Sequence, residues 1–184
     1  MQDDELVGRI QSGDDRAVAE LHGRYVDAVF RYLLTQTSSY HDAEELLQDV
    51  FFRAASKIHS FRGEASVKTW LFSIAKNAVK DYYRRRAKHD MVKTMEEKDL
   101  EQSSFSKDNA EKQMMRHIHM NELEQCMKEL PLEYRQVLHL RFLEDMSIKE
   151  TSQVLEKSQL SVKALQWRAR KKLKECMGME VFAE

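Results

Sequence analysis

The stretch from Phe61 to Arg86, FRGEASVKTWLFSIAKNAVKDYYRRR, guides the interpretation of the whole chain. Apolar side chains recur in it at the spacing of one helix face, at Leu71, Ile74, Ala75, Ala78 and Tyr82. The opposite face carries an aromatic ring, an amide and three cations: Trp70, Asn77, Lys76, Lys80 and Arg84. Cations follow phosphates and a ring stacks on an unpaired base, so this face favours a nucleic-acid contact. An amphipathic surface helix with a half-buried Trp is the alternative that this stretch alone leaves open.

The composition indicates an all-helical protein. The chain of 184 residues has five glycines and one proline, and no glycine lies between Gly63 and Gly178. Tight hairpins depend on glycine, so a sheet is not expected. No apolar run approaches the roughly 20 residues of a membrane span, and the N-terminus lacks an apolar signal segment. We therefore expect a cytoplasmic protein.

The charges are balanced in number but segregated along the chain. There are 30 basic and 31 acidic residues, with basic clusters at residues 84–88 and 168–174 and acidic clusters at residues 42–49 and 96–101. A DNA-binding protein with one site is usually basic overall. Two separate basic patches therefore predict two nucleic-acid contacts and a further partner for the acidic surface.

An acidic helix is predicted over residues 41–58, with Asp42 as its N-cap. Its outer face carries Glu44, Glu45, Gln48, Asp49 and Phe52. A solvated acidic face is one interpretation of this pattern. An exposed phenylalanine among acids instead indicates a protein interface.

The C-terminal part predicts a helix-turn-helix. Pro131 begins a helix that is expected to bury Phe142, and Ser147 and Glu150 form a capping box for the next one. A basic helix follows from Ser161 to about Glu175, typical of a recognition helix in the major groove. The expected base contacts are Gln159, Ser161, Lys163, Ala164 and Trp167, and the expected phosphate contacts are Arg168, Arg170, Lys171 and Lys174. A solvated basic helix is the alternative.

The sequence predicts no catalysis. It shows no nucleophile–base pair, phosphate-binding glycine loop or metal-ligand spacing, so we expect no enzyme, no cofactor and no metal. Cys126 and Cys176 lie far apart and outside any CxxC motif, and are expected to be reduced thiols.

Five blocks together resemble a bacterial RNA polymerase sigma factor of the extracytoplasmic-function (ECF) group. They occur in the order and spacing of that family: SGDDRAVAELHGRY, DAEELLQDVFFRAASKI, FRGEASVKTWLFSIAKNAVKDYYRRR, LPLEYRQVLHLRFLEDMSIKETSQVL and SVKALQWRARKKL. The chain departs from the family at Leu160-Ser161, where Gly-Thr is common, and at Ser152, Leu165 and Trp167. These departures all lie in the part that the resemblance assigns to the −35 element.

The resemblance implies two small helical domains joined by a flexible linker. Residues 1–88 would bind core polymerase and recognise and melt the −10 element, residues 89–114 would be the linker near the RNA exit path, and residues 115–178 would read the −35 element, with a tail at 179–184. The implied −10 contacts are Phe61, Arg62, Ser66, Lys68, Trp70, Lys76, Asn77, Lys80 and Arg84. Contacts to the clamp helices of the polymerase β′ subunit would come from Glu45, Gln48, Asp49, Phe52 and Arg53.

The partners implied are core polymerase, through β′ and β, promoter DNA and an anti-sigma factor, which is often membrane-anchored. An ordinary helix-turn-helix regulator with an N-terminal sensing or dimerisation domain is the alternative. That class has no need of the basic, Trp-bearing face in residues 61–86.

Overall fold

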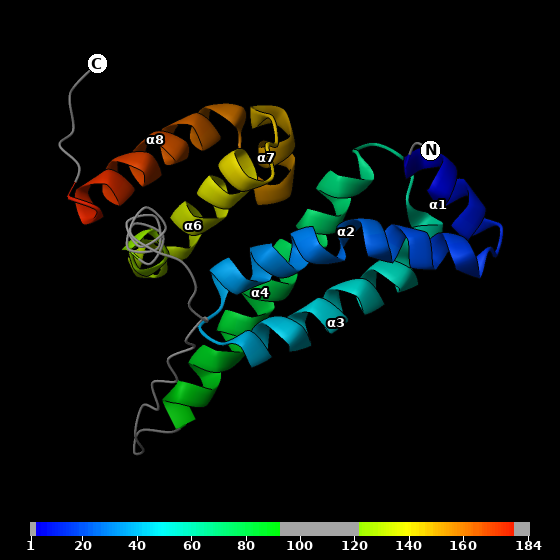
Figure 1. Ribbon diagram of the computed structural model, residues 1–184, viewed down its shortest axis with the longest axis horizontal. Coiled ribbons are helices and arrows are strands. Elements are labelled where there is room, and N and C mark those ends of the chain that lie inside the picture. Colours follow the sequence, from blue (N-terminus) through cyan, green and yellow to red (C-terminus); the bar gives the residue numbers. More distant parts are fainter. Residues whose placement is uncertain (1–2, 93–121, 179–184) are drawn as a thin grey trace, which may run out of the picture. The chain divides into compact units, whose positions relative to one another are not determined.

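The computed structural model describes residues 3–92 and 122–178, and the chain divides into two compact units. Helices α1 to α4 lie in the first unit, and α6, η2, α8 and most of α7 lie in the second (Figure 1). Every regular element in the described ranges is helical, which confirms the all-helical prediction. None of the described helices is long and apolar enough to cross a membrane.

Three long helices build the first unit. Its elements are α1 (Asp3–Gln11), α2 (Asp15–Gln36), α3 (Tyr40–Lys57), the short η1 (Ile58–Ser60) and α4 (Val67–Val92). Helix α4 packs against both α2 and α3. The core is centred on Tyr32 and Phe72, whose ring centroids lie 5.5 Å apart, and both side chains are fully buried.

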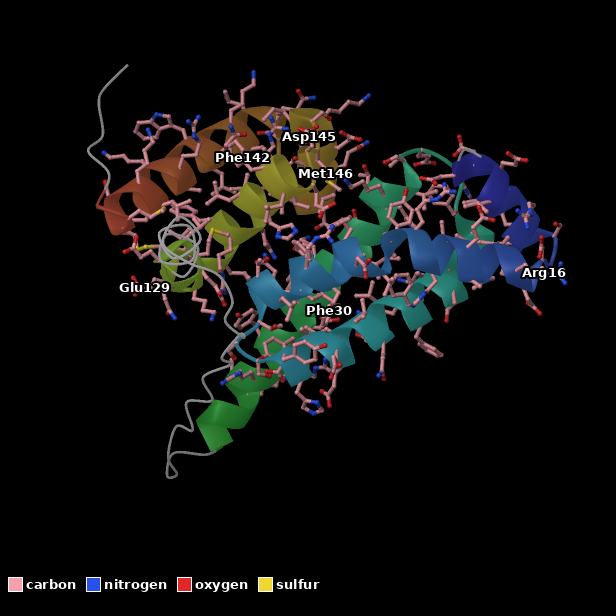
Figure 2. The ribbon with its side chains drawn as sticks, in the orientation of Figure 1. Arg16, Phe30, Glu129, Phe142, Asp145 and Met146 are labelled. Atoms are coloured by element: carbon pink, nitrogen blue, oxygen red, sulfur yellow. A yellow bond between two sulfur atoms is a disulfide. The ribbon has the colours of Figure 1, made fainter. Side chains whose placement is uncertain are left out.

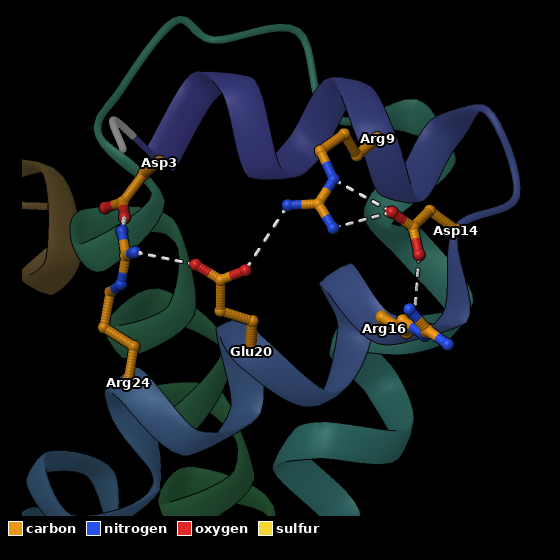
Figure 3. Close-up of polar contacts among 6 residues, drawn as sticks. All are labelled: Asp3, Arg9, Asp14, Arg16, Glu20 and Arg24. Carbon is orange, nitrogen blue, oxygen red and sulfur yellow. Dashed lines mark hydrogen bonds and ion pairs between the residues drawn. The ribbon is translucent and has the colours of Figure 1, made fainter.

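Helix α1 is fastened to α2 by a chain of charged side chains (Figure 3). Arg9 bridges Asp14, at 2.7 Å, and Glu20, at 3.4 Å. Arg24 pairs with Glu20 and with Asp3. The hydrogen bond from Arg9 lowers the pKa of the Asp14 carboxyl. Beneath these pairs Leu6, Val7 and Ile10 bury the apolar side of α1.

The predicted cap of α3 is wrong by one turn. Ser39 is the N-cap, and its Oγ accepts a hydrogen bond from the backbone N–H of Asp42 at 3.0 Å. The Asp42 carboxylate accepts instead from the Tyr82 hydroxyl of α4, at 2.8 Å. Serine and aspartate are both good caps, and here the aspartate is used to join α3 to α4.

The second unit contains helical residues 122–129, α6 (Leu132–Leu138), η2 (His139–Leu143), α7 (Ile148–Leu155) and α8 (Gln159–Cys176). The predicted capping box is confirmed: Glu150 N–H donates to Ser147 Oγ at 3.1 Å, and Ser147 N–H donates to the Glu150 carboxylate at 2.8 Å. Helix α6 packs against α8. Helices α7 and α8 are joined by a short turn through Glu156 and Ser158, which gives the expected helix-turn-helix.

Phe142 is exposed, contrary to the sequence expectation. Element η2 is a π-helix, in which Glu144 N–H donates to the carbonyl of His139, five residues earlier. The wider turn ends the 3.6-residue periodicity of α6, so that His139 and Leu140 are buried and Phe142 is 53% exposed. Figure 2 marks Phe142 with Asp145 and Met146 in this part of the second unit.

The two cysteines form a disulfide, which corrects the prediction of reduced thiols. Cys126 and Cys176 are 50 residues apart in sequence, and their Cα atoms lie 5.7 Å apart. The bond joins the helical segment 122–129 to the last residue of α8.

Most of the predicted linker, residues 89–114, lies outside the described residues, and α4 continues to Val92.

Candidate nucleic-acid and polymerase interfaces

The loop that leads into α4 is held from two sides. Gln11, at the end of α1, donates from Nε2 to the carbonyl oxygens of Ile58, at 2.9 Å, and Phe61, at 3.2 Å. On the other side Ser66 caps α4, because its Oγ accepts from the backbone N–H of Thr69 at 3.1 Å. The Ser66 hydroxyl, predicted to contact DNA, is thus already engaged. Between these anchors Gly63 has φ +73°, a conformation that suits glycine.

Trp70 is half-buried and supports this loop. Its ring centroid lies 5.1 Å from that of Phe61, with the planes tilted by 55°. Trp70 also lines an apolar hollow of about 240 Å³ together with Val18, Leu21 and Phe51. The side chain therefore belongs both to the packing of the first unit and to the underside of the loop.

Beyond Trp70, the exposed face of α4 is polar and cationic. Asn77, Lys80 and Arg84 are all exposed, and their spacing of three and four residues places them on one side of the helix. Arg84 pairs with Asp81 at 3.1 Å, but its side chain remains 69% exposed. In the loop, Arg62 is exposed as well. The three side chains on α4 form one exposed row that suits a nucleic-acid strand, and Arg62 adds an exposed cation in the loop before it.

The predicted exposure of Lys76 is wrong. Lys76 is buried, and it lies four residues after Phe72 and three before Val79, both of which are fully buried. Its Nζ pairs with Glu156 at 3.1 Å, in the segment 153–156 that groups with the first unit. Phe72 and Val79 also widen the buried face of α4, which packs against both α2 and α3.

Helix α3 carries the candidate polymerase face. Phe52 is 73% exposed, and Glu45 and Gln48 are exposed beside it. The other two predicted members are paired: Arg53 donates from Nε to Asp49 at 2.8 Å and from Nη1 to Asp81 of α4 at 3.0 Å. The hydrogen bonds that Arg53 donates to Asp49 and Asp81 raise the pKa of Arg53, and the bond from Arg53 lowers the pKa of Asp81. Asp49 and Arg53 therefore hold α3 against α4, whereas Phe52 does not.

Helix α8 presents the predicted recognition surface. Val162, Leu165 and Ala169 are buried against the rest of the unit, as expected. Most of the predicted DNA contacts are exposed, namely Gln159, Ser161, Lys163, Trp167, Arg168, Arg170 and Lys171. Ala164 is half-buried. Ser161 also takes part in the N-terminal cap, where its hydroxyl lies 2.8 Å from that of Ser158.

Contacts from α8 to the π-helix and along α8 itself order this surface. Arg141 of η2 donates from Nε to Gln166 of α8 at 3.0 Å. The guanidinium of Arg170 lies 5.9 Å from the ring centroid of Phe142, and Lys171 Nζ lies 5.7 Å from that of Trp167. The exposed ring of Phe142 thus makes a cation–π contact with Arg170. Among the described residues, no group of three His, Cys, Asp or Glu side chains is placed to hold a metal ion.

Comparisons with known proteins match a stretch of sequence in each of the two units. Residues 21–89 match the model of Sigma-70 region 2, and residues 120–173 match that of Sigma-70, region 4. The ECF RNA polymerase sigma factor SigM of Bacillus subtilis is 38% identical over 158 residues, which cover 85% of this chain and 93% of SigM. The chain belongs to the ECF group of the sigma-70 family. It is thus a sigma factor that directs promoter-specific transcription initiation, a non-enzymatic role, and the hypothesis of an ordinary helix-turn-helix regulator is set aside.

Further relatives share the same extent and fold. The ECF RNA polymerase sigma-E factor of Haemophilus influenzae is 31% identical over 179 residues and covers 92% of each chain. Among solved structures, the sigma factor RpoE in complex with the anti-sigma factor NepR from Bartonella quintana has a TM-score of 0.70 at 19% identity, covering 89% of this chain and 98% of that one. CnrH in complex with the cytosolic domain of CnrY has a TM-score of 0.69 at 22% identity, covering 94% and 95%. These structures share the fold of the ECF sigma factor described here.

Proposed function

We infer that the exposed row on α4 and the loop before it recognise and melt the −10 promoter element. The observation that carries this is the alignment of Asn77, Lys80 and Arg84 on one exposed side of α4. A melted strand needs phosphate contacts and groups that meet its unpaired bases. The row supplies cations and one amide, and the loop from Phe61 to Ser66 is braced beside it by Trp70. Residues 1–88 form the corresponding functional domain.

The polymerase contact in this proposal is the exposed face of α3. Phe52 is 73% exposed, among acids, with no structural task in the first unit. An apolar ring of this size inside a polar rim suits a protein partner, and we assign it to the clamp helices of the β′ subunit. Glu45 and Gln48 complete the contact, while Asp49 and Arg53 keep α3 in place.

The −35 element is assigned to α8, within a domain of residues 115–178. Its first turns, with Gln159 and Lys163, would meet base edges in the major groove. Its later turns, with Arg168, Arg170 and Lys171, would hold phosphates. In the cytoplasm the chain would be held inactive by an anti-sigma factor. The structural neighbours named above, one with the anti-sigma factor NepR and one with the cytosolic domain of CnrY, support that assignment.

One experiment tests all three surfaces in the assembled initiation complex. A photo-crosslinking amino acid is placed singly at Phe52, Asn77 or Lys163, each of which is exposed, and the chain is combined with core polymerase and promoter DNA. We expect crosslinks to the β′ subunit, to the −10 strand and to the −35 duplex, respectively. The exposed Asp27 of α2 is the control position and should give none of these. Crosslinking of position 77 to the −35 duplex, or of position 163 to the −10 strand, would overturn the assignment.

A further inference from the structure

Leu160 is the most exposed of the large apolar side chains in the part of the chain that the structure describes. It is 78% exposed, compared with 73% for Phe52 and 65% for Trp167. It is the second residue of α8, directly after Gln159 and two residues after the N-cap Ser158. Single exposed apolar residues are common on protein surfaces, so exposure alone assigns no role. The position of Leu160 and its surroundings provide the further argument.

The buried face of α8 fixes the direction in which Leu160 points. Val162, Leu165 and Ala169 are buried and turned toward the core of the second unit. Leu160 shares the other side of the helix with Lys163 and Trp167, three and seven residues further on, both of which are exposed. Leu160 thus lies at the N-terminal end of the surface assigned above to base edges.

The charges around Leu160 favour a polyanion as the binding partner of this face of α8, rather than an apolar protein surface. Glu175, near the far end, is the one acid of α8, whose cations are Lys163, Arg168, Arg170, Lys171, Lys172 and Lys174. The polar neighbour Ser161 is already engaged, because its N–H donates to Ser158 Oγ at 3.1 Å and its hydroxyl lies 2.8 Å from the same oxygen. Among the exposed side chains of this first turn, Leu160 is therefore the large apolar one.

We propose that Leu160 contacts the C5-methyl group of a thymine in the −35 duplex and so determines specificity at that base pair. The methyl group of thymine is the apolar group that unmodified DNA displays in the major groove, and apolar side chains recognise it there. Lys163, one turn further along the same side, then lies over an adjacent position where it donates to a guanine. The proposal rests on the function inferred above, in which α8 enters the major groove.

Replacement of thymine by deoxyuridine tests this contact, because it removes the methyl group and preserves every hydrogen-bonding edge. The probe is the duplex that the wild-type chain, bound to core polymerase, selects from a random pool. Each dT in its −35 segment is replaced in turn by dU. One of these replacements should weaken binding of the wild type by about fourfold, the effect of burying one methyl-sized group. The variant L160A should bind the dT and dU duplexes at that position equally well.

Leu143→Ala is the matched control. Leu143 is also exposed and apolar, but it lies on η2 and should leave the dU effect unchanged. An equal dU effect in the wild type and in L160A at every position would overturn the assignment of Leu160. Weaker binding of L160A to core polymerase without DNA would overturn it as well, in favour of a protein contact. Failure of the wild type to select any sequence would overturn the proposed function itself.

Discussion

The ring of Phe61 lies against the ring of Trp70, with centroids 5.1 Å apart, so the loop before α4 rests on the helix that follows it. This contact couples the stability of the first unit to the position of the loop. Trp70 lines the apolar hollow together with other side chains of the first unit, and its ring also contacts the ring of Phe61. Asn77, two turns further on, has no such packing role and is exposed.

Trp70 and Asn77 should therefore behave differently when replaced. Asn77→Ala should leave the stability of the first unit unchanged and slow open-complex formation roughly three- to tenfold, the effect of losing one hydrogen bond. A promoter with a pre-melted bubble should restore its rate. Trp70→Ala should slow opening too, but should also lower the free energy of unfolding by about 2 kcal/mol, less than the ~3–5 kcal/mol of a fully buried Trp. Thermal melting and stopped-flow opening assays distinguish the two. Equal stability losses in both variants would contradict this division.

Phe52→Ala should weaken the binding of core polymerase. Removal of an apolar hot spot typically costs about 2 kcal/mol, so we expect the Kd to rise roughly thirtyfold. Folding should not change, because the side chain is 73% exposed. Val18→Ala, at a partly exposed apolar position on α2, is the control. Fluorescence anisotropy of labelled chain titrated with core polymerase measures both. An unchanged Kd for Phe52→Ala would assign this face to another partner.

Two lysines of α8 should have separable effects on −35 DNA. Lys163→Ala should relax the base preference, since each lost base contact is worth roughly 1–3 kcal/mol of discrimination. Lys171→Ala should weaken binding to all sequences alike and reduce the salt slope by about 0.9 for one lost phosphate contact. Lys171 lies over Trp167, with its Nζ 5.7 Å from the ring centroid, within the range of a cation–π contact. Titrations at several salt concentrations on matched and mismatched duplexes test both, and sequence-independent losses for Lys163→Ala would contradict its role.

The first unit should lose stability at alkaline pH. Burial raises the pKa of the Tyr82 hydroxyl, and its hydrogen bond to Asp42 raises it further. The folded state thus favours the neutral phenol, and its stabilising contribution is present below the ordinary tyrosine pKa of about 10 and is lost as the pH rises through the higher folded value. Tyr82→Phe should flatten the decline of the unfolding free energy above pH ~10. Urea melts followed by Trp70 fluorescence in a Trp167→Phe background measure this, and an unchanged slope would contradict it.

Reduction of the disulfide should destabilise the second unit alone. The bond closes a loop of 50 residues, which in the chain-entropy treatment corresponds to about 4 kcal/mol. Dithiothreitol, or the double variant Cys126→Ser with Cys176→Ser, should lower its melting temperature. Trp167 fluorescence in a Trp70→Phe background reports on this unit, and Trp70 fluorescence in a separate Trp167→Phe background reports on the first unit as the control. Identical melting with and without reductant would contradict the expectation.

Features fixed by neighbouring residues were predictable from the sequence. The capping box of Ser147 and Glu150 depends on two side chains three residues apart, and both hydrogen bonds are present. The buried stripe of α8, with Val162, Leu165 and Ala169, also followed from spacing alone. The sigma-factor family could be predicted because five long blocks of the sequence resemble it.

Features that depend on tertiary context were missed. Lys76 was placed on the exposed side because its ion pair with Glu156 joins residues that are far apart in the sequence. The burial of Phe142 was predicted wrongly because no residue pattern indicates a π-helix. The disulfide was missed because its cysteines are 50 residues apart and share no spacing motif. The link from Gln11 to Phe61 joins distant segments and left no local signal.

The hydrogen bond from Gln11 to Phe61 shows that the boundary of the folded unit differs from the boundary of the region 2 match. The match to Sigma-70 region 2 begins at residue 21, but α1 begins at Asp3 and holds the loop before α4 through Gln11. A fragment cut at residue 21, where the region 2 match begins, would uncover the core beneath Leu6, Val7 and Ile10 and release the carbonyls of Ile58 and Phe61. The segment before the region 2 match thus sets the geometry of a loop that lies within the match, and any fragment meant to open DNA has to keep both.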